Sequence, residues 1–236
     1  MSNEPVIPDF GEASSCVEQN RTFCTDWVRE NWDPVLQPAL LDHIKLTVIA
    51  VGLGFAISLV AALVAHRLRR LETPIALFSA IVYTIPSLAL FQLLVPVTGL
   101  TVTTVEIALV GYTLLILFRN ILAGLRATPP DVLEAARGMG LTETQTLLRV
   151  ELPLALPAIM AGLRVAVVST IALATIAAFV VSQGLGGPIL GALRQDFTTE
   201  ILAAGGLAIG LAILADALLV VVQRLLTPWA AARRLA

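Results

Sequence analysis

The sequence predicts an all-α membrane protein with about five transmembrane helices. Two observations lead to this fold class. Of the 236 residues, 57% are hydrophobic and only 14% are charged, and apolar runs of about 20 residues, the length that crosses a bilayer, recur along the chain. Because lipid offers no hydrogen-bond partners, a backbone inside it must satisfy its own polar groups, as a helix does. We therefore expect a multi-pass protein of the cell (inner or plasma) membrane, in contact with lipid.

Residues 1–42 are expected to form an extracytoplasmic N-terminal tail, ahead of a transmembrane domain over residues 43–236. No cleavable signal peptide is visible, because the start of the chain is polar and the first apolar run is long enough to span. The tail holds Cys16 and Cys24, the only cysteines. Outside the cytoplasm a disulfide can persist, so we expect these two to pair; two free thiols are the alternative.

The first expected span covers residues 44–65, and Trp27 and Trp32 ahead of it indicate an interfacial segment. The second covers residues 74–97 and contains Pro86, which removes one helix hydrogen bond and favours a kink. The kink either faces a pathway through the membrane or serves packing alone. On the first reading, the residues of the pathway or gate include Tyr83, Thr84, Pro86 and Ser87.

The third expected span covers residues 103–125 and is interrupted by Glu106, Arg119 and Asn120. The two charged residues lie toward the ends of the span, from which long side chains reach water. We therefore expect Glu106 and Arg119 to snorkel toward the membrane surface.

The fourth and fifth expected spans cover residues 155–181 and 201–226. Arg164 and Asp216 lie within them at similar depth, and an ionisable residue inside a membrane is a functional candidate. We expect the two to pair, either as part of a gate or as a packing salt bridge between the spans.

Glycines mark the region between these spans and the fifth span itself. The stretch SQGLGGPILGAL cannot continue the fourth helix and is expected to form a re-entrant or mobile loop near the outer mouth. Gly206 and Gly210 have the GxxxG spacing that permits close helix contact. The residues that break the helix in the stretch are Gly184, Gly186, Gly187 and Pro188.

Arginine positions predict the orientation, since basic residues are in excess on the cytoplasmic side of a membrane. Three clusters fall on one face of the expected spans, whereas the opposite face is rich in carboxylates. This distribution places the N-terminus outside and the C-terminus in the cytoplasm. The clusters are Arg67, Arg69 and Arg70; Arg126, Arg137 and Arg149; and Arg224, Arg233 and Arg234.

The cytoplasmic loop over residues 127–156 carries signals for two helices. Thr128 is expected to cap the first helix, with prolines and an aspartate in its first turn. Gly140 fits a left-handed C-terminal cap, and Thr142 with Gln145 has the spacing of a capping box. Two prolines are expected to end the second helix, Pro153 and Pro157.

The first of these helices is expected to carry a small, smooth face that can seat a partner closely. Ala135, Ala136 and Met139 lie on or near one side of it, with Glu134 and Arg137 beside them.

Several kinds of chemistry have no support in the sequence. Lys45, the only lysine, follows no glycine-rich turn, so the chain has no nucleotide-binding P-loop. His43 and His66 lie at opposite ends of one span, which argues against a metal centre. No Ser/His/Asp arrangement is apparent. We expect no catalytic residue, no metal, no cofactor and no nucleic-acid partner.

The loop resembles the cytoplasmic signature of ABC-importer permeases, in which EAA is followed by a spaced glycine and an Ile-x-Leu-Pro motif. The matching residues are Glu134, Ala135, Ala136, Gly140, Val150, Leu152 and Pro153, with Val150 in place of isoleucine as the departure. The resemblance implies a type I importer permease whose loop forms a coupling helix in a groove of an ABC ATPase. The residues that it implicates are Glu134, Ala135, Ala136, Arg137, Met139, Gly140 and Leu141.

Among importers, the chain is most similar to the osmoprotectant permeases for glycine betaine, carnitine or choline. The tail with two cysteines, the segment TIPSLALF at 84–91, the loop and the segment GLGGPIL at 184–190 carry this resemblance. It implies a separate ATPase, a separate extracytoplasmic binding protein and a second permease subunit, identical or different. The alternatives are a permease for another small solute, such as an amino acid or alkylsulfonate, and an ion-coupled secondary transporter.

Overall fold

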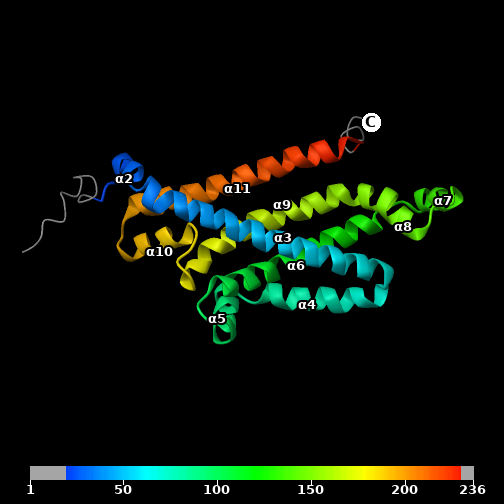
Figure 1. Ribbon diagram of the computed structural model, residues 1–236, viewed down its shortest axis with the longest axis horizontal. Coiled ribbons are helices and arrows are strands. Elements are labelled where there is room, and N and C mark those ends of the chain that lie inside the picture. The colour runs from blue at the N-terminus through cyan, green and yellow to red at the C-terminus, as the bar shows by residue number, and fades with distance from the viewer. Residues whose placement is uncertain (1–19, 230–236) are drawn as a thin grey trace, which may run out of the picture.

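A computed structural model describes residues 20–229, which are almost entirely helical (Figure 1). The long helices run nearly along one axis and α5 lies across it, with α7 at one end and α2 and α10 at the other (Figure 1). We call these the α7 end and the α2 end. The elements are α2 (Thr25–Glu30), η1 (Trp32–Leu36), α3 (Gln37–Arg67), η2 (Arg69–Leu71), α4 (Glu72–Thr84), α5 (Ser87–Thr98), α6 (Val102–Arg126), α7 (Pro130–Gly138), α8 (Glu143–Thr146), η3 (Leu147–Glu151), α9 (Leu152–Ile176), η4 (Ala177–Phe179), α10 (Gly186–Arg194) and α11 (Thr198–Leu226).

Within residues 20–229, four helical stretches are long and apolar enough to cross a membrane, and a bent pair of helices, counted as one span, brings the number to five. The number of spans therefore agrees with the sequence, but the helices are longer than the apolar runs. Hydropathy marks the part of a helix that suits lipid, whereas the helix itself continues into polar sequence as long as its hydrogen bonds continue. The four stretches are Trp32–Arg67, Val102–Arg126, Glu143–Phe179 and Thr198–Leu226.

The second predicted span is broken rather than merely kinked. Its halves, α4 and α5, meet at 100°. Both residues of the junction are extended: Ile85 has ψ 129° and Pro86 has ψ 135°. Proline disfavours the helical region for the residue before it and offers no N–H itself, so the helix ends and starts again. The Tyr112 hydroxyl of α6 donates to the free carbonyl of Ile85 and holds the break in place.

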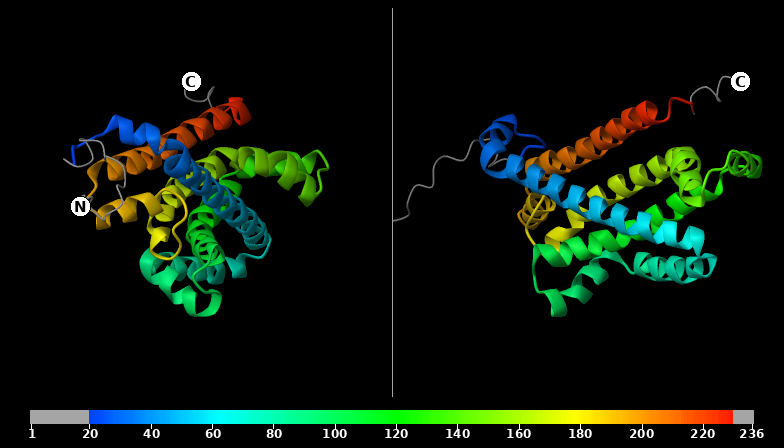
Figure 2. Two further views of the ribbon diagram at one scale, coloured as in Figure 1. Left: turned by 60° about the vertical axis from the view of Figure 1, so that its left-hand side comes forward. Right: turned by 45° about the vertical axis from the view of Figure 1, so that its right-hand side comes forward.

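The core consists of α3, α6 and α9, which pack along their length (Figure 2). It has two clusters of buried apolar side chains, one toward each end of the bundle. Glycines let the backbones approach closely, because an added Cβ at Gly162 of α9 would lie 2.5 Å from the Cβ of Asn120 in α6. One at Gly54 of α3 would lie 1.8 Å from the Thr113 hydroxyl oxygen.

The loop at the α7 end folds mostly as the sequence predicts. Gly140 has φ +79°. The amides of Gly140 and Leu141 donate to the carbonyls of Arg137 and Ala136, which is the Schellman pattern. Thr142 and Gln145 form the predicted capping box, with bonds of 3.3 and 2.9 Å.

Two predictions for this loop are wrong. Thr128 does not cap α7, because Pro130 holds Pro129 extended and the helix begins one residue later than expected. The Thr128 hydroxyl is buried and bonds to no group in residues 20–229. Pro153 and Pro157 do not end a helix either: helical structure continues from Glu143 to Phe179 through the π-turn η3. Pro153 directly follows η3 inside this continuous helical run, so its missing N–H removes one hydrogen bond without ending the helix.

The glycine-rich stretch near the α2 end leaves the fourth span as predicted, but most of it forms the helix α10 instead of a loop. Gly184 has φ +71°. Gly186 lies so close to α9 that a Cβ would approach the Thr175 carbonyl oxygen to 2.1 Å. The fully buried His43 of α3 joins this region to α9. Its Nδ1 accepts from the Leu185 N–H at 3.2 Å and its Nε2 lies 3.0 Å from the Ile171 carbonyl, which fits a neutral ring protonated on Nε2.

The last helix, α11, contacts α9 and α10 but moves away from the bundle toward its C-terminal end (Figures 1 and 2). Only 6% of its most apolar window is buried within the described chain. Added Cβ atoms at Gly206 and Gly210, the GxxxG pair, would meet nothing within 4 Å among residues 20–229, so neither glycine is required for a close approach of helices there.

Candidate functional site

A cavity of about 440 Å³ lies where the second span breaks. We call it the break cavity. It is formed by the junction of α4 and α5 together with α6 and α9. All four predicted pathway residues line it, and the structure adds others from distant parts of the sequence. Its lining is Tyr83, Thr84, Ile85, Pro86, Ser87, Tyr112, Thr113, Ile116, Ala166, Ser169, Thr170, Ala172 and Leu173.

The break cavity is aromatic and hydroxyl-rich, and no charged side chain of residues 20–229 lines it. The rings of Tyr83 and Tyr112 meet edge to face, with centroids 6.0 Å apart and planes at 70°. Thr84 and Thr113 donate to carbonyls within their own helices, at 2.8 and 2.7 Å, which leaves the lone pairs of their oxygens available. Such a lining can offer hydrogen bonds to a polar solute and carries no charge that would bind the solute tightly.

Sequence reasoning missed the residues that α6 and α9 contribute to this cavity. A signal for them exists in the helical periodicity: Ala166, Ser169, Thr170 and Leu173 recur at the spacing of one helix face. Ser169 and Thr170 put two hydroxyls on that face within an apolar helix.

Arg164 and Asp216 meet, but away from the break cavity, whose lining includes neither. The guanidinium of Arg164 in α9 makes two parallel bonds to the carboxylate of Asp216 in α11, Nε to Oδ1 at 2.7 Å and Nη2 to Oδ2 at 2.8 Å. Such a two-pronged pair fixes geometry as well as charge. About a third of each side chain remains exposed, 34% and 35%. The predicted gate residues therefore occupy two separate places.

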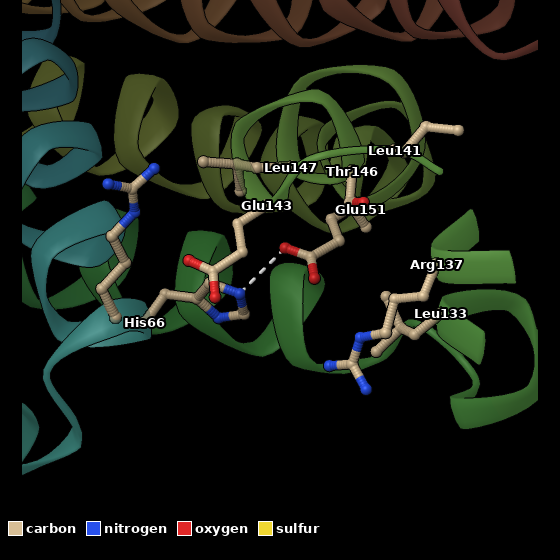
Figure 3. Close-up of a pocket in the computed structure, with 9 residues that line it drawn as sticks. His66, Leu133, Arg137, Leu141, Glu143, Thr146, Leu147 and Glu151 are labelled. Atoms are coloured by element: carbon tan, nitrogen blue, oxygen red, sulfur yellow. Dashed lines mark ion pairs between the residues drawn. The ribbon is translucent and has the colours of Figure 1, made fainter. Parts of the chain in front are cut away.

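A second cavity, of about 360 Å³, lies at the α7 end, between the end of α3, α7 and the α8–η3 segment (Figure 3). We call it the loop cavity. His66 of α3 points toward Glu151 of η3, with Nε2 and Oε2 2.8 Å apart (Figure 3). Arg137 and Leu141, two of the implicated coupling residues, line it as well. The pair ties the first span to the helix that follows the loop.

The predicted contact face of α7 needs a correction. Ala135 and Glu134 are exposed and Met139 is 72% exposed, as a docking face requires, but Ala136 is only 1% exposed. Ala136 is the C3 residue of the helix, and its carbonyl accepts the Schellman bond from Leu141, so it lies where the loop folds back on the helix. Ala136 is therefore packed beneath the contact face and is not part of its surface.

Two further predictions concern the charged residues of the third span and the pair of cysteines. Glu106 does not reach water: both carboxylate oxygens are buried without a hydrogen-bond partner in residues 20–229. It lies one turn inside α6, too deep in the packed bundle for its short side chain to snorkel. Arg119 is exposed. Cys16 lies outside the described residues, so the Cys16–Cys24 disulfide stays a prediction; Cys24 itself is buried.

A bundle of membrane-crossing helices with a broken span around a polar cavity, and a folded loop projecting at one end, is the architecture of a multi-pass permease. Residues 54–231 match the family described as "Binding-protein-dependent transport system inner membrane component", and the chain belongs to that family. It is thus a membrane permease of the ABC-importer class, as the loop motif implied.

Curated relatives are similar over most of the chain. The choline transport system permease protein OpuBB of Bacillus subtilis is 35% identical over 188 residues, covering 79% of this chain and 86% of the relative. The osmoprotectant import permease protein OsmW of Salmonella typhimurium is 37% identical over 191 residues, covering 79% and 89%. The carnitine transport permease protein OpuCD of Listeria monocytogenes is 38% identical over 182 residues, covering 77% and 78%.

Solved structures agree on the fold. A chain of the MetNI methionine ABC transporter, in an inward-facing conformation, superposes with a TM-score of 0.72 at 18% identity, covering 86% of this chain and 100% of that one. This likeness confirms the type I importer permease architecture.

Proposed function

We propose that this chain is the membrane-spanning subunit of an ATP-driven importer for a small quaternary-ammonium osmoprotectant, such as glycine betaine, carnitine or choline. The observation that carries the proposal is the similarity, at 35–38% identity over more than three quarters of the chain, to permeases named for choline, osmoprotectants and carnitine. The uncharged break cavity is compatible with a solute that carries its own positive charge.

The loop at the α7 end is proposed to dock on a separate ABC ATPase that hydrolyses the nucleotide. In support, α7 projects beyond the bundle (Figure 1), its start is set by Pro129 and Pro130, and its C-terminal end is fixed by the Schellman bonds. Its exposed residues, among them Glu134, Ala135 and Met139, offer a small surface with one anchor side chain. A rigid helix can transmit the movement of a partner, whereas a flexible loop would absorb it.

Two further partners belong to the proposal: an extracytoplasmic binding protein that delivers the solute, and a second permease subunit, identical or different. The orientation that this requires puts the α7 end in the cytoplasm and the α2 end outside. The arginines that follow the first and last spans support that orientation.

The test is uptake by cells that lack other osmoprotectant importers and that express the chain with its ATPase and binding protein. We expect accumulation of radiolabelled glycine betaine, carnitine or choline, and loss of it when the P-loop lysine of the ATPase is replaced. If the cells import only an amino acid or an alkylsulfonate, the proposed quaternary-ammonium solute is wrong and that other solute takes its place. Import that survives the inactive ATPase but stops with a protonophore would instead indicate an ion-coupled transporter.

A further inference from the structure

The two tyrosines of the break cavity form a feature that a general polar pathway does not require. Tyr83 and Tyr112 are the only tyrosines in the chain, they lie on different helices, and they meet edge to face at the same cavity. Tyr112 is 5% exposed and Tyr83 is 42% exposed. The Tyr112 ring is therefore held within the bundle, and the Tyr83 ring is the more accessible of the two.

The position of Tyr112 is set by its hydroxyl. The hydroxyl donates to the Ile85 carbonyl that the break leaves without a helix partner. Since this bond occupies the polar end of the side chain, what the residue presents to the rest of the cavity is its ring. Removing the hydroxyl would release the break, whereas removing the ring would change the lining.

The lining of the break cavity favours a cation that has no N–H groups to donate. A tetra-alkylated nitrogen cannot donate hydrogen bonds, so it gains little from hydroxyl or carbonyl acceptors and most from the negative faces of aromatic rings. Thr84, Ser87, Ser169 and Thr170 supply hydroxyls at the same cavity, which suit the carboxylate or hydroxyl at the other end of such a solute. Among the residues that the structure describes, no carboxylate lines the cavity to hold the cation tightly. A weak site of this kind can release its ligand, as a transport pathway must.

We propose that the Tyr83–Tyr112 pair binds the quaternary ammonium group of the solute within the membrane through cation–π contact, so that the permease itself, and not its binding protein alone, selects for that group. This inference rests on the proposed function and deepens it, because it assigns a solute-recognising site to this chain. It gives Tyr83 the larger role in selection and Tyr112 the additional role of holding the break.

The experiment measures weak binding directly, without a binding protein. The chain is purified with its ATPase in lipid nanodiscs, and saturation transfer to the trimethylammonium protons of choline is recorded by NMR. The neutral isostere 3,3-dimethylbutan-1-ol serves as a second probe of the same shape without the charge. Wild type is expected to bind choline in preference to the isostere.

The variants distinguish the effect of the aromatic ring from that of the hydroxyl and from a change in stability. We expect Tyr83→Phe to keep the preference for choline and Tyr83→Leu to weaken choline binding about five- to thirty-fold, while binding of the isostere changes little. Phe78→Leu removes a ring from an exposed position of the same helix and is the matched control that should change nothing. Tyr112→Phe should keep the preference but lower thermal stability, because it releases the Ile85 carbonyl.

Two outcomes overturn the inference: wild type that binds choline no better than the isostere, or Tyr83→Leu that keeps the full preference. Whole-cell uptake distinguishes failure of the tyrosine site from failure of the proposed function. If wild type imports a quaternary ammonium solute and Tyr83→Leu imports it at the same rate, only the tyrosine site is rejected. If wild type imports none of the three solutes, the proposed solute class is rejected.

Discussion

A single backbone angle decides how α7 ends. Gly140 has φ +79°, and no atom outside its chain neighbours lies within 4 Å of the position that its Cβ would take. Steric crowding with other parts of the chain is therefore no obstacle to a larger residue there; the obstacle is the left-handed conformation itself, which costs a residue other than glycine about 1–2 kcal/mol. The Schellman turn at this position aims α7 and its exposed face.

We predict that Gly140→Val weakens co-purification of the ATPase and lowers transport, because a β-branched residue resists this conformation most strongly. Membrane insertion should be unchanged, since the spans are untouched. Gly140→Asn should be milder, as asparagine tolerates the left-handed region. Gly138→Val is the control, because Gly138 also has open space around it but an ordinary φ. Normal ATPase co-purification and normal transport in Gly140→Val would refute the docking proposal for this loop.

Single residues also explain which site predictions succeeded. Gly140 and the Thr142–Gln145 box were predictable because their chemistry is local, decided by a glycine and by two side chains three positions apart. His43 gave no such signal. Its partners, Ile171 and Leu185, are 128 and 142 residues away, and nothing in the neighbouring sequence indicates that a histidine there will join three segments.

At the scale of helices, close packing depends on glycines that face a neighbour. Gly162 of α9 is the sharpest case, because an added Cβ would meet the Cβ of Asn120 at 2.5 Å, an atom that moves only with its backbone. We predict that Gly162→Ala destabilises the protein by about 1–3 kcal/mol, the usual cost of an overpacked site. Thermal unfolding of the purified protein in detergent measures it.

Gly52→Ala in α3 is the matched control, since nothing lies within 4 Å of its added Cβ. It should be neutral or slightly stabilising, because alanine favours a helix over glycine. Equal unfolding temperatures for the two variants would mean that α6 and α9 do not approach as closely as described.

The Arg164–Asp216 pair joins α9 to α11, which has the smallest buried share of the four unbroken candidate spans. We predict that Arg164→Ala and Asp216→Ala each lower stability, and that the double variant is less impaired than the sum of the two, because each single change leaves one charge without its partner. A double-mutant cycle on thermal stability measures the coupling. We expect transport to recover together with stability, as a packing role requires. Recovery of stability with abnormal ATPase coupling would instead assign the pair to a gate.

The sequence predicted the helices but not the angle at which two of them meet. Pro86 in an apolar span indicates a kink, yet the same residue is compatible with a modest bend or with the 100° break that the structure has. What distinguishes them is tertiary: the Tyr112 hydroxyl lies 27 positions along the chain and satisfies the Ile85 carbonyl. A local pattern contains no information about that contact. For the same reason, the part of the break cavity that could be predicted was the part on the broken span.

For the molecule as a whole, the orientation proposed from the arginines is testable at the two ends of the bundle. Arg69 and Arg194 are both exposed and lie on opposite ends, near the start of α4 and at the end of α10. With the native cysteines replaced by serine, we predict that a membrane-impermeant thiol reagent labels Arg194→Cys in intact cells and labels Arg69→Cys only after the membrane is opened. Labelling of position 69 from outside would reverse the orientation and remove α7 from the ATPase side.

The segment that starts the described chain meets the beginning of the last helix. The Cys24 amide donates to the Thr199 hydroxyl at 3.0 Å across 175 positions, and Trp27 packs edge to face on Phe197. A ribosome adds about 5–20 residues per second, so roughly 9–35 s separate the synthesis of these two partners. The helices α3, α6 and α9 are all made during that interval and can pack without α11. Among the described residues, the segment that is made first is therefore among the last to complete its contacts, and a chain that stops before α11 lacks the Thr199 hydroxyl to which the Cys24 amide donates.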